Sequence, residues 1–327
     1  MLSYVVRRAL YGLVVLAGVN FATFVLFFTV NTPDDMARLN IGGKRVTQEL
    51  IDRWKAERGY DKPLYWNGAR LGADKLTETI FWERSVSLFS LNFGRADSEA
   101  AGDIGHEVAR RMRVSIQLAL PIFAMQILAS VSFALVLVLF RNSRLDLAGV
   151  VLCVVMLSIS SLFYIIVGQF AFARVMRLVP ISGFGAGLDL IRFLALPVML
   201  SVIARLGAEA RLYRAMLLEE TGKDFVRTAR AKGLGETRVL SRHVLRNALI
   251  PIITSAGGYL PFVFMGSLLF ESFFGIPGLG AYVIEAISKQ DFAIVRTMVF
   301  VGSCLYIASY ALIDVAYTWA DPRVRLG

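Results

Sequence analysis

The sequence predicts an all-α integral membrane protein with six transmembrane helices and both termini in the cytoplasm. Of its 327 residues, 56% are hydrophobic and 18% are charged, a composition outside that of soluble domains. The apolar residues form runs about as long as the roughly 20-residue helix that crosses a bilayer. The basic residues lie between these runs, as they do in cytoplasmic loops beside membrane spans.

Four uncharged runs are long enough to cross a bilayer without help from their neighbours. They are residues 9–30, 114–140, 147–173 and 247–270. A fifth span, residues 297–313, becomes long enough if its helix extends past Arg296 and Asp314, whose side chains can reach the interface. The first run follows Arg7 and Arg8 and has no A-x-A-like cleavage site after it, so we expect an uncleaved first span.

The sixth span follows from the orientation of the basic segments. Residues 205–247 contain ten basic and five acidic residues, so we expect this segment in the cytoplasm together with the N-terminus. Three spans cannot join two cytoplasmic segments. The short uncharged stretch 193–204 must therefore belong to a fourth crossing, which we predict over residues 188–208.

The spans divide the chain into three parts. Residues 1–30 form the N-terminus and the first span. Residues 31–113 form a long polar segment, here called the cap. We expect the cap outside the cytoplasm, because long loops translocate largely regardless of charge. Within the cap, residues 46–59 predict a short surface helix that starts at Thr47 and stops at Gly59. Residues 114–327 form a five-span core that contains a cytoplasmic segment over residues 209–247.

Cysteine and histidine usage gives no support for a metal site or a catalytic centre. Cys153 and Cys304 lie inside apolar runs, where they act as small apolar side chains rather than as a CxxC pair or a disulfide. His106 and His243 are far apart, and neither belongs to an HExxH motif. Without a histidine in a span, no serine–histidine pair is available to an intramembrane enzyme. We therefore predict no catalytic residue and no metal ligand.

The partners expected from composition are lipids rather than nucleic acids. The formal net charge is +10, but the sequence has no cluster that combines aromatic and basic residues as base-binding surfaces do. The chain also has no GxxxxGK[ST] loop, since the pairs Gly43-Lys44 and Gly222-Lys223 both lack the first glycine of the motif and the serine or threonine that follows its lysine. Any ATP chemistry must then reside on another chain.

The polar stretch 219–251 has helical periodicity and predicts a helix, a glycine turn and a second helix at the cytoplasmic surface. Gly233 and Gly235 break the pattern between the two halves. In the first half, the residues at helical spacing are Leu218, Gly222, Phe225 and Ala229. In the second half, one face of the helix carries Arg238, Arg242 and Arg246, and another face carries Leu240 and Val244. From the residues alone, an amphipathic hairpin that rests on anionic headgroups explains this pattern equally well.

The same stretch carries a resemblance to a known family. The sequences DFVRTARAKGL at 224–234 and RNALIP at 246–251 resemble the cytoplasmic signature loop of B-type permeases in the peptide/nickel (dipeptide and oligopeptide) family of binding-protein-dependent ABC importers. Other stretches similar to family landmarks occur in the family's order: YVVRR at 4–8, GYDKPL at 59–64, NFGR at 92–95, PISG at 180–183, GIPGLG at 275–280 and DPR at 321–323. The chain departs from the general pattern in having Arg-Thr-Ala at 227–229 in place of E-A-A, and the stretch 63–92 is longer than usual.

The resemblance implies a transmembrane permease subunit with the type I ABC importer permease fold, multi-pass in the bacterial inner (plasma) membrane, that takes up peptides or peptide-like solutes. Its implied partners are a second, C-type permease subunit that shares the pathway, two cytoplasmic ATP-binding subunits that bind ATP and Mg, and an extracytoplasmic solute-binding protein. It implies no cofactor on this chain. The residues implied to couple the spans to the ATPase are Asp224, Arg227, Arg230, Ala231, Lys232, Gly233 and Leu234.

Polar residues inside spans are costly and therefore indicate the transport pathway. The residues predicted to line it are Gln117, Gln126, Gln169 and Glu271. The alternatives are that the glutamines form hydrogen bonds between helices and that Glu271 lies at the outer interface. The residues predicted to kink the fifth span or form the turn at its outer end, as parts of a gate, are Pro251, Gly257, Gly258, Pro261, Gly275, Pro277 and Gly278.

Three other functions compete with a peptide permease. An ion-coupled secondary carrier would be expected to show inverted halves and mid-span acids, and we find neither in the sequence. A membrane-anchored interaction protein leaves the patterned segment 209–247 unexplained. An ABC importer for nickel chelates or opines fits the same resemblance, because relatives handle such cargo.

Overall fold

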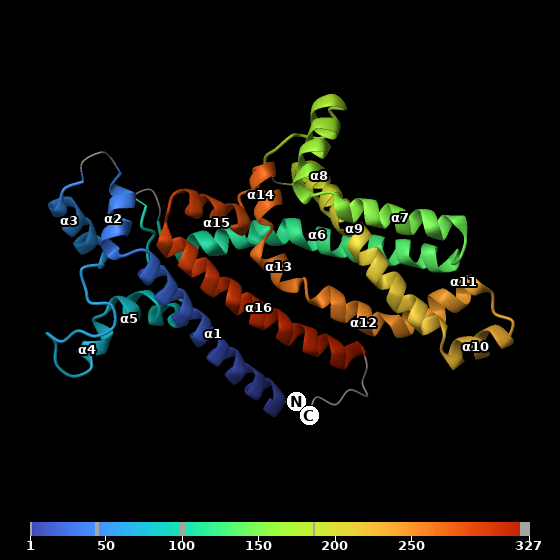
Figure 1. Ribbon diagram of the computed structural model, residues 1–327, viewed down its shortest axis with the longest axis horizontal. Helices are drawn as coiled ribbons and strands as arrows, with labels where there is room; N and C mark the ends of the chain where they lie inside the picture. Colours follow the sequence, from blue (N-terminus) through green and yellow to red (C-terminus); the bar gives the residue numbers. More distant parts are fainter. Residues whose placement is uncertain (1, 43–45, 99–101, 186, 321–327) are drawn as a thin grey trace. The chain divides into compact units, whose positions relative to one another are not determined.

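The structure is a computed structural model, and it describes residues 2–42, 46–98, 102–185 and 187–320. This part of the chain is helical apart from turns, loops and one isolated antiparallel bridge between Arg95 and Asp103 (Figure 1). The all-α prediction is therefore confirmed. The landmark at 321–323 lies outside the described residues.

Most elements are α-helices, and three short ones differ: η1 is a 3₁₀ helix, while η2 and η3 are π-helices. The first half of the chain contains α1 (Leu2–Val30), α2 (Pro33–Ile41), α3 (Gln48–Arg58), α4 (Asp74–Thr77), α5 (Ile80–Arg84), η1 (Val86–Ser90), α6 (Ile104–Leu139), α7 (Arg144–Ser158), α8 (Ser161–Gly168) and η2 (Gln169–Val175). The second half contains α9 (Leu188–Thr221), α10 (Asp224–Ala231), α11 (Glu236–Val239), η3 (Leu240–Val244), α12 (Leu245–Gly257), α13 (Leu260–Met265), α14 (Leu268–Phe274), α15 (Leu279–Ser288) and α16 (Phe292–Ala320).

Four helices in the described part of the chain are long and apolar enough to cross a membrane. Their spans are Leu10–Val30 in α1, Ile104–Leu139 in α6, Asp189–Thr221 in α9 and Phe292–Ile313 in α16. Two bent helix pairs, Arg144–Ser158 with Ser161–Val175 and Leu268–Phe274 with Leu279–Ser288, pass the same test as single spans. The chain therefore has four to six candidate spans. The spans predicted at 9–30, 114–140, 188–208 and 297–313 fall on α1, α6, α9 and α16.

The span expected over residues 247–270 is wrong as one continuous helix. Its residues belong to α12, α13 and the first half of α14, with a break after Gly257. At this break Tyr259 N–H donates to the carbonyl of Ala256 over 3.0 Å. Pro261 then lies in the first turn of α13, the position where its missing N–H costs least. The kink expected from the prolines and the glycine pair is thus a complete interruption.

The span expected over residues 147–173 is also interrupted. Helix α7 ends at Ser158, and α8 begins at Ser161 at an angle of 92° to it. Ser160 caps the new helix, since its hydroxyl accepts a hydrogen bond from the N–H of Leu162. An uncharged run that looked uniform therefore contains a helix start signal in its middle.

Contacts divide the described chain into two compact units, one from residues 1–113 with 278–308 and one from residues 114–277 with 309–327. The first unit contains the cap. Its predicted surface helix is confirmed as α3, which Gly59 follows in the left-handed conformation. Thr47 precedes the helix, but its side chain forms no capping hydrogen bond. The apolar core of the cap joins α1, α2, α3 and α5 through the buried side chains Phe24, Phe28, Met36, Ala37, Ile51, Trp54, Tyr60 and Ile80.

Two buried aspartates attach the cap to α16. Asp97 accepts hydrogen bonds from the Tyr60 hydroxyl and from the N–H of Ala293, over 3.1 Å each. Asp291 accepts from the N–H of Ser98 over 2.9 Å. The cap contains no cysteine, and these bonds with its aromatic core hold it together in the absence of a disulfide.

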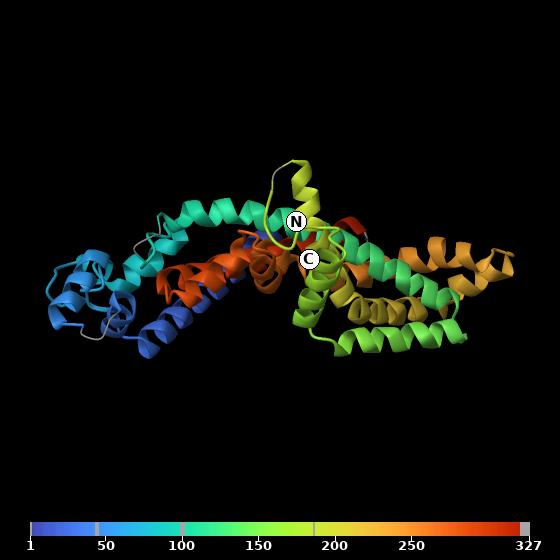
Figure 2. The same ribbon diagram turned by 90° about the horizontal axis from the view of Figure 1, so that it is seen from above.

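The second unit is organised around α9, which packs along α7 (Figures 1 and 2). The closest approach is at Gly207, where a Cβ atom would lie 2.5 Å from the carbonyl oxygen of Cys153 and 3.0 Å from Cβ of Met156. Only glycine fits between the two helices at this distance. Arg214, further along α9, forms a bidentate pair with Asp146 near the start of α7, at 2.7 and 2.9 Å.

We expect Gly207→Ala to separate α7 from α9 and to lower the free energy of unfolding by about 1–3 kcal/mol, as overpacked interfaces do. The measurement is thermal unfolding of the purified protein in detergent. Gly18→Ala in α1 is the matched control, because no heavy atom lies within 4 Å of the added methyl group. Equal melting temperatures for the two variants would contradict the close packing at Gly207.

Candidate functional site

One face of α9 connects two features of the second unit. Arg205, Glu209, Tyr213 and Leu217 follow one another at i, i+4 spacing, which places them on one side of the helix. The first three line a cavity. Tyr213 and Leu217 also belong to a buried apolar cluster. A single continuous helix therefore borders both the cavity and the cluster.

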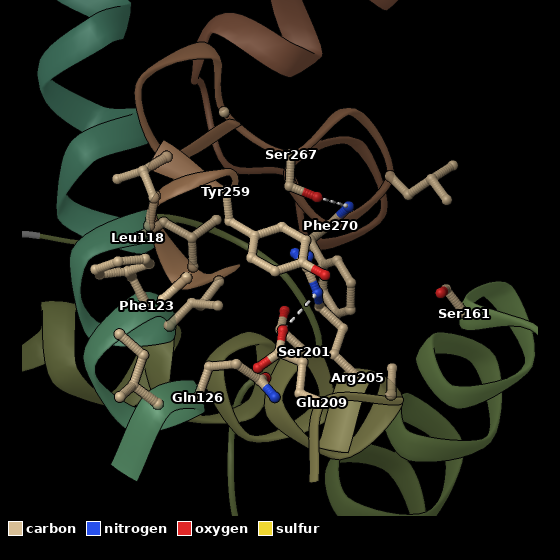
Figure 3. Close-up of a pocket in the computed structure, with 18 of the residues that line it drawn as sticks. Leu118, Phe123, Gln126, Ser161, Ser201, Arg205, Glu209, Tyr259, Ser267 and Phe270 are labelled. Atoms are coloured by element: carbon tan, nitrogen blue, oxygen red, sulfur yellow. Dashed lines mark hydrogen bonds and ion pairs between the residues drawn. The ribbon is translucent and has the colours of Figure 1, made fainter. Parts of the chain in front are cut away.

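The cavity has a volume of about 550 Å³, within the range of about 300–1,000 Å³ that small-molecule sites occupy (Figure 3). It lies among α6, α9 and the α12–α14 region, and most of its lining is apolar. The apolar side chains on it include Leu118, Ile122, Phe123, Val263, Leu268 and Phe270. The polar groups are few and come mainly from α6 and α9.

Three polar residues of the cavity, Gln126, Arg205 and Glu209, are linked to one another, in part through Ser130. The amide nitrogen of Gln126 donates to the Ser130 hydroxyl over 2.9 Å, and this hydroxyl donates to Oε2 of Glu209 over 3.4 Å. Nε of Arg205 lies 3.6 Å from Oε1 of Glu209, and its guanidinium carbon lies 4.0 Å from the centre of the Tyr259 ring. Figure 3 shows Gln126, Arg205 and Glu209 near the Tyr259 ring. Tyr259 itself marks the break between α12 and α13.

The predicted pathway residues do not all meet in this cavity. Gln126 lines it, whereas Gln117, on the same helix α6, is exposed and does not. The amide of Gln169 donates to the carbonyls of Ile181 and Phe273 over 3.1 and 3.0 Å, so it joins two segments of the chain. Glu271 is fully buried and accepts from the Ser115 hydroxyl over 2.7 Å and from the N–H of Ser267 over 3.3 Å.

Sequence analysis missed Arg205, Glu209 and Tyr259 as lining residues. The charges of Arg205 and Glu209 were counted with the basic segment 205–247, although Arg205 also falls in the span predicted over residues 188–208. The helix continues without a break to Thr221, and Glu209 is buried. A signal was available: two opposite charges at i, i+4 with apolar residues on their flanks can neutralise each other inside a bundle.

The predicted gate and turn residues lie at the breaks of the α12–α15 region. Pro251 is inside α12, and a Cβ on Gly257 would lie 2.7 Å from Ile313 of α16. Gly258 and Pro261 flank the break itself. Between α14 and α15, Gly275 adopts a left-handed conformation, Pro277 follows, and Gly278 directly precedes α15.

The patterned segment, which the sequence predicts in the cytoplasm, folds as α10, a turn over residues 232–235, then α11, η3 and α12. Its apolar side packs against α6 and α9. The buried members of this cluster are Ala134, Val138, Tyr213, Leu217, Val226, Ala229, Val239, Leu240, Val244, Ala248 and Ile252. The predicted apolar face of Leu240 and Val244 is therefore confirmed, and the arginines at 238, 242 and 246 are all exposed.

The first half of the segment differs from its predicted pattern. Gly222 lies in a break between α9, which ends at Thr221, and α10, which begins at Asp224, so these residues do not form one helix with Leu218. The buried positions of α10 are Val226 and Ala229 rather than Phe225 and Ala229. The first buried position lies one residue later than predicted, because a new helix begins after Lys223.

The turn after α10 is held by backbone bonds and one ion pair. Gly233 has φ of 76°, a left-handed conformation that β-branched residues rarely adopt, and its N–H donates to the carbonyl of Arg230 over 2.9 Å. The Arg230 guanidinium bridges the turn to Glu236 through bonds of 2.6 and 3.1 Å. Of the residues expected at an ATPase contact, Asp224, Arg227, Arg230, Ala231, Lys232 and Gly233 are exposed, while Leu234 packs partly on the apolar cluster.

Comparison with known proteins identifies the class to which this architecture belongs. Residues 114–326 match the family described as binding-protein-dependent transport system inner membrane component, and residues 1–83 match the N-terminal part of such membrane components. The chain belongs to this family, and it is therefore a non-catalytic, multi-pass permease of the inner membrane.

Individual relatives cover almost the whole chain. A relative from Brucella abortus (strain 2308) is 32% identical over 99% of both chains. The di/tripeptide transport system permease protein DppB of Pseudomonas aeruginosa is 30% identical over 99% of both chains. The dipeptide transport system permease protein DppB of Bacillus subtilis is 29% identical over 76% of this chain and 78% of its own. The family resemblance expected from the signature segment is confirmed.

The ion pair across the turn predicts a pH dependence of local order. Hydrogen bonds from Arg230 lower the pKa of Glu236 below its ordinary value of 4.5. A carboxyl group whose folded pKa is depressed contributes stability that is present above its unfolded pKa and is lost as the pH falls through the folded pKa. We expect Glu236→Gln at pH 7 to increase amide hydrogen exchange at 232–235 by about one and a half to fivefold, the range for exposed pairs of about 0.2–1 kcal/mol.

Glu219→Gln, an exposed acid at the end of α9, is the control for this measurement. The wild-type turn should lose the same protection only when the pH is brought below about 4.5. Exchange at 232–235 that is identical in both variants at pH 7 would mean that the pair does not order the turn.

Proposed function

We propose that this chain is the B-type permease subunit of an ATP-driven importer for peptides or peptide-like solutes. It forms the translocation pathway with a second, C-type permease. Two cytoplasmic subunits bind ATP and Mg²⁺ and hydrolyse the nucleotide, and an extracytoplasmic binding protein delivers the solute. The membership of the family supports the transport role, and the names of the P. aeruginosa and B. subtilis relatives support peptides as cargo.

The observation that carries the proposal is that the turn around Gly233 is exposed while the apolar side of the same segment is buried. A segment that only rested on lipid headgroups would turn its apolar side toward the bilayer. Here the apolar side of the segment packs on Tyr213 and Leu217 of α9, and the polar tip around Gly233 is left accessible. This arrangement suits a rigid contact with an ATPase subunit, because force on the tip reaches the spans through packed side chains.

The proposed topology has six spans with both termini in the cytoplasm and the type I ABC importer permease fold. The third span is the bent pair α7 with α8, and the fifth span, over residues 247–270, consists of α12, α13 and the start of α14. In this arrangement residues 1–30 form the first span, residues 31–113 form an extracytoplasmic cap beside the binding protein, and residues 114–327 form the core. The cytoplasmic coupling segment lies within residues 209–247.

Single-cysteine labelling tests this topology. In a background with Cys153→Ala and Cys304→Ala, we expect Ser241→Cys to react with an impermeant maleimide in inside-out vesicles and not in intact spheroplasts. Ala69→Cys in the cap is the control and should show the opposite pattern, since both side chains are exposed. Labelling of Ser241→Cys from the outer side would exclude the six-span arrangement.

The proposed pathway passes the cavity and the breaks of the α12–α15 region. Gln126 lies on the pathway, and Gln117, Gln169 and Glu271 are further pathway candidates outside the cavity lining. Gating uses the breaks near Pro251, Gly257, Gly258 and Pro261 and the turn of Gly275, Pro277 and Gly278. Helix interruptions of this kind are tolerated in a membrane where they line a cavity or pack against protein.

The glycine turn provides a test of coupling. Gly233→Val forces a β-branched residue into φ of 76°, at a cost of about 1–2 kcal/mol, although no heavy atom lies within 4 Å of the new Cβ. In the assembled importer we expect normal insertion, transport reduced at least about tenfold, and loss of ATPase stimulation by the loaded binding protein. Gly235→Val is the matched control, because Gly235 has φ of −63° and equal open space.

A second control separates coupling from lipid attachment. Changing Arg238 and Arg242 together to Gln removes about 1 kcal/mol of headgroup attraction per residue and leaves the turn intact. If this double variant lost transport while Gly233→Val retained tightly coupled hydrolysis, the segment would be a membrane-surface hairpin.

A further inference from the structure

The cavity of the second unit contains one positive and one negative side chain in an otherwise apolar lining. Glu209 is 3% exposed, and its only charged partner among the described side chains is Arg205, whose side chain is 41% exposed. The distance of 3.6 Å between Arg205 Nε and Glu209 Oε1 is too long for a hydrogen bond by usual standards. The cavity is thus neutral as a whole, but its pair is loosely joined.

Several buried polar atoms around this pair have no hydrogen-bond partner in the described structure. They are Oε1 of Gln126, Oε1 of Glu209, the hydroxyl of Ser201 and the hydroxyl of Tyr213. Leaving such a group unpaired costs about 1–3 kcal/mol, and more for a charged one. Gln126 is only 5% exposed. Two of the four atoms, on Glu209 and Gln126, can only accept, so the cavity offers acceptors to a ligand that brings N–H donors.

We propose that this cavity is a binding site for a small zwitterion, with the ligand's ammonium group on Glu209 and Gln126 and its carboxylate on Arg205. A ligand with both charges replaces the loose internal pair by two hydrogen-bonded pairs and keeps the cavity neutral. A ligand with one charge would leave either Arg205 or Glu209 without a counter-ion in an apolar lining, which is strongly unfavourable. The proposal rests on the proposed transport of peptides and specifies the group that this chain recognises.

Distances along the helix favour a short peptide over a longer one. Residues at i and i+4 have Cβ atoms about 5–6 Å apart. An extended chain spans at most about 3.3–3.6 Å per residue, so the two ends of a dipeptide lie no more than about 7 Å apart. Arg205 is partly exposed, so in this proposal its guanidinium turns from Glu209 toward the carboxylate of the ligand and gives up its contact with the Tyr259 ring. A dipeptide with free termini therefore matches the two charges.

The test is equilibrium dialysis of radiolabelled dipeptides against the assembled importer in nanodiscs, in the absence of the binding protein. The probes are dialanine, N-acetyl-dialanine, which lacks the ammonium group, and dialanine amide, which lacks the carboxylate. We expect dialanine to bind about tenfold to a hundredfold more tightly than either capped probe, the range for charged hydrogen bonds. This comparison uses the unaltered chain and does not depend on the folding of a variant.

Two substitutions assign each charge to its partner. Glu209→Gln should remove the preference for dialanine over N-acetyl-dialanine, and Arg205→Gln should remove the preference over dialanine amide. Glu219→Gln and Arg211→Gln are the matched controls, since both residues are exposed on α9 and neither lines the cavity. Both controls should retain the two preferences.

The proposal is overturned if the unaltered importer binds none of the probes, if it binds all three equally, or if each cavity variant weakens all probes by one common factor. Its failure can be distinguished from failure of the proposed function. Dialanine uptake with stimulated ATP hydrolysis but equal binding of the three probes would contradict only the proposed cavity site. Selective dialanine binding without ATPase stimulation by a loaded binding protein would remove the importer assignment and leave the site.

Discussion

The burial of one apolar surface between α9 and the segment α10–α12 is the constraint on which the second unit depends. Val226 and Ala229 on one side of the glycine turn and Val239, Leu240 and Val244 on the other pack on the same part of the bundle. Each fully buried valine or leucine contributes about 1.5–3 kcal/mol relative to exposure. Because this contact buries the apolar side of the segment, it determines which residues are left exposed at the tip.

The same contact gives a role to the length of α9. Its face with Arg205, Glu209, Tyr213 and Leu217 begins at the cavity and ends under the coupling segment. Tyr213 belongs to both, since it lines the cavity and is a member of the buried cluster. A cut or bend between Arg205 and Leu217 would separate the cavity from the segment. Gly207, on this stretch, keeps the helix packed on α7.

The features predicted correctly from the sequence are those that depend on local patterns. Hydropathy located α1, α6 and α16, the orientation of the basic segments located α9, and the flanking residues Thr47 and Gly59 located α3. The breaks after Ser158 and Gly257 were harder to predict, because an uncharged run has the same hydropathy whether its helix continues or a new helix begins. The cavity was harder still to predict. Glu209 looks like one acid in a basic loop until the packing of α6 shows that Ser130 and Gln126 lie beside it.

Coupling between the tip and the cavity requires more than a rigid connection. A ligand shifts a conformational equilibrium only by the difference in its affinity for the two states, so the cavity must offer different partners in each. The loose pair of Arg205 and Glu209 provides such a difference, because Arg205 also contacts Tyr259 at the break between α12 and α13. Movement at this break would change how far Arg205 can reach toward Glu209. Both charges sit on α9, which the coupling segment covers, while their third partner sits on the interrupted helix. In the proposed importer, the break at Tyr259 is therefore the place where a change at the ATPase contact would alter the affinity of the cavity.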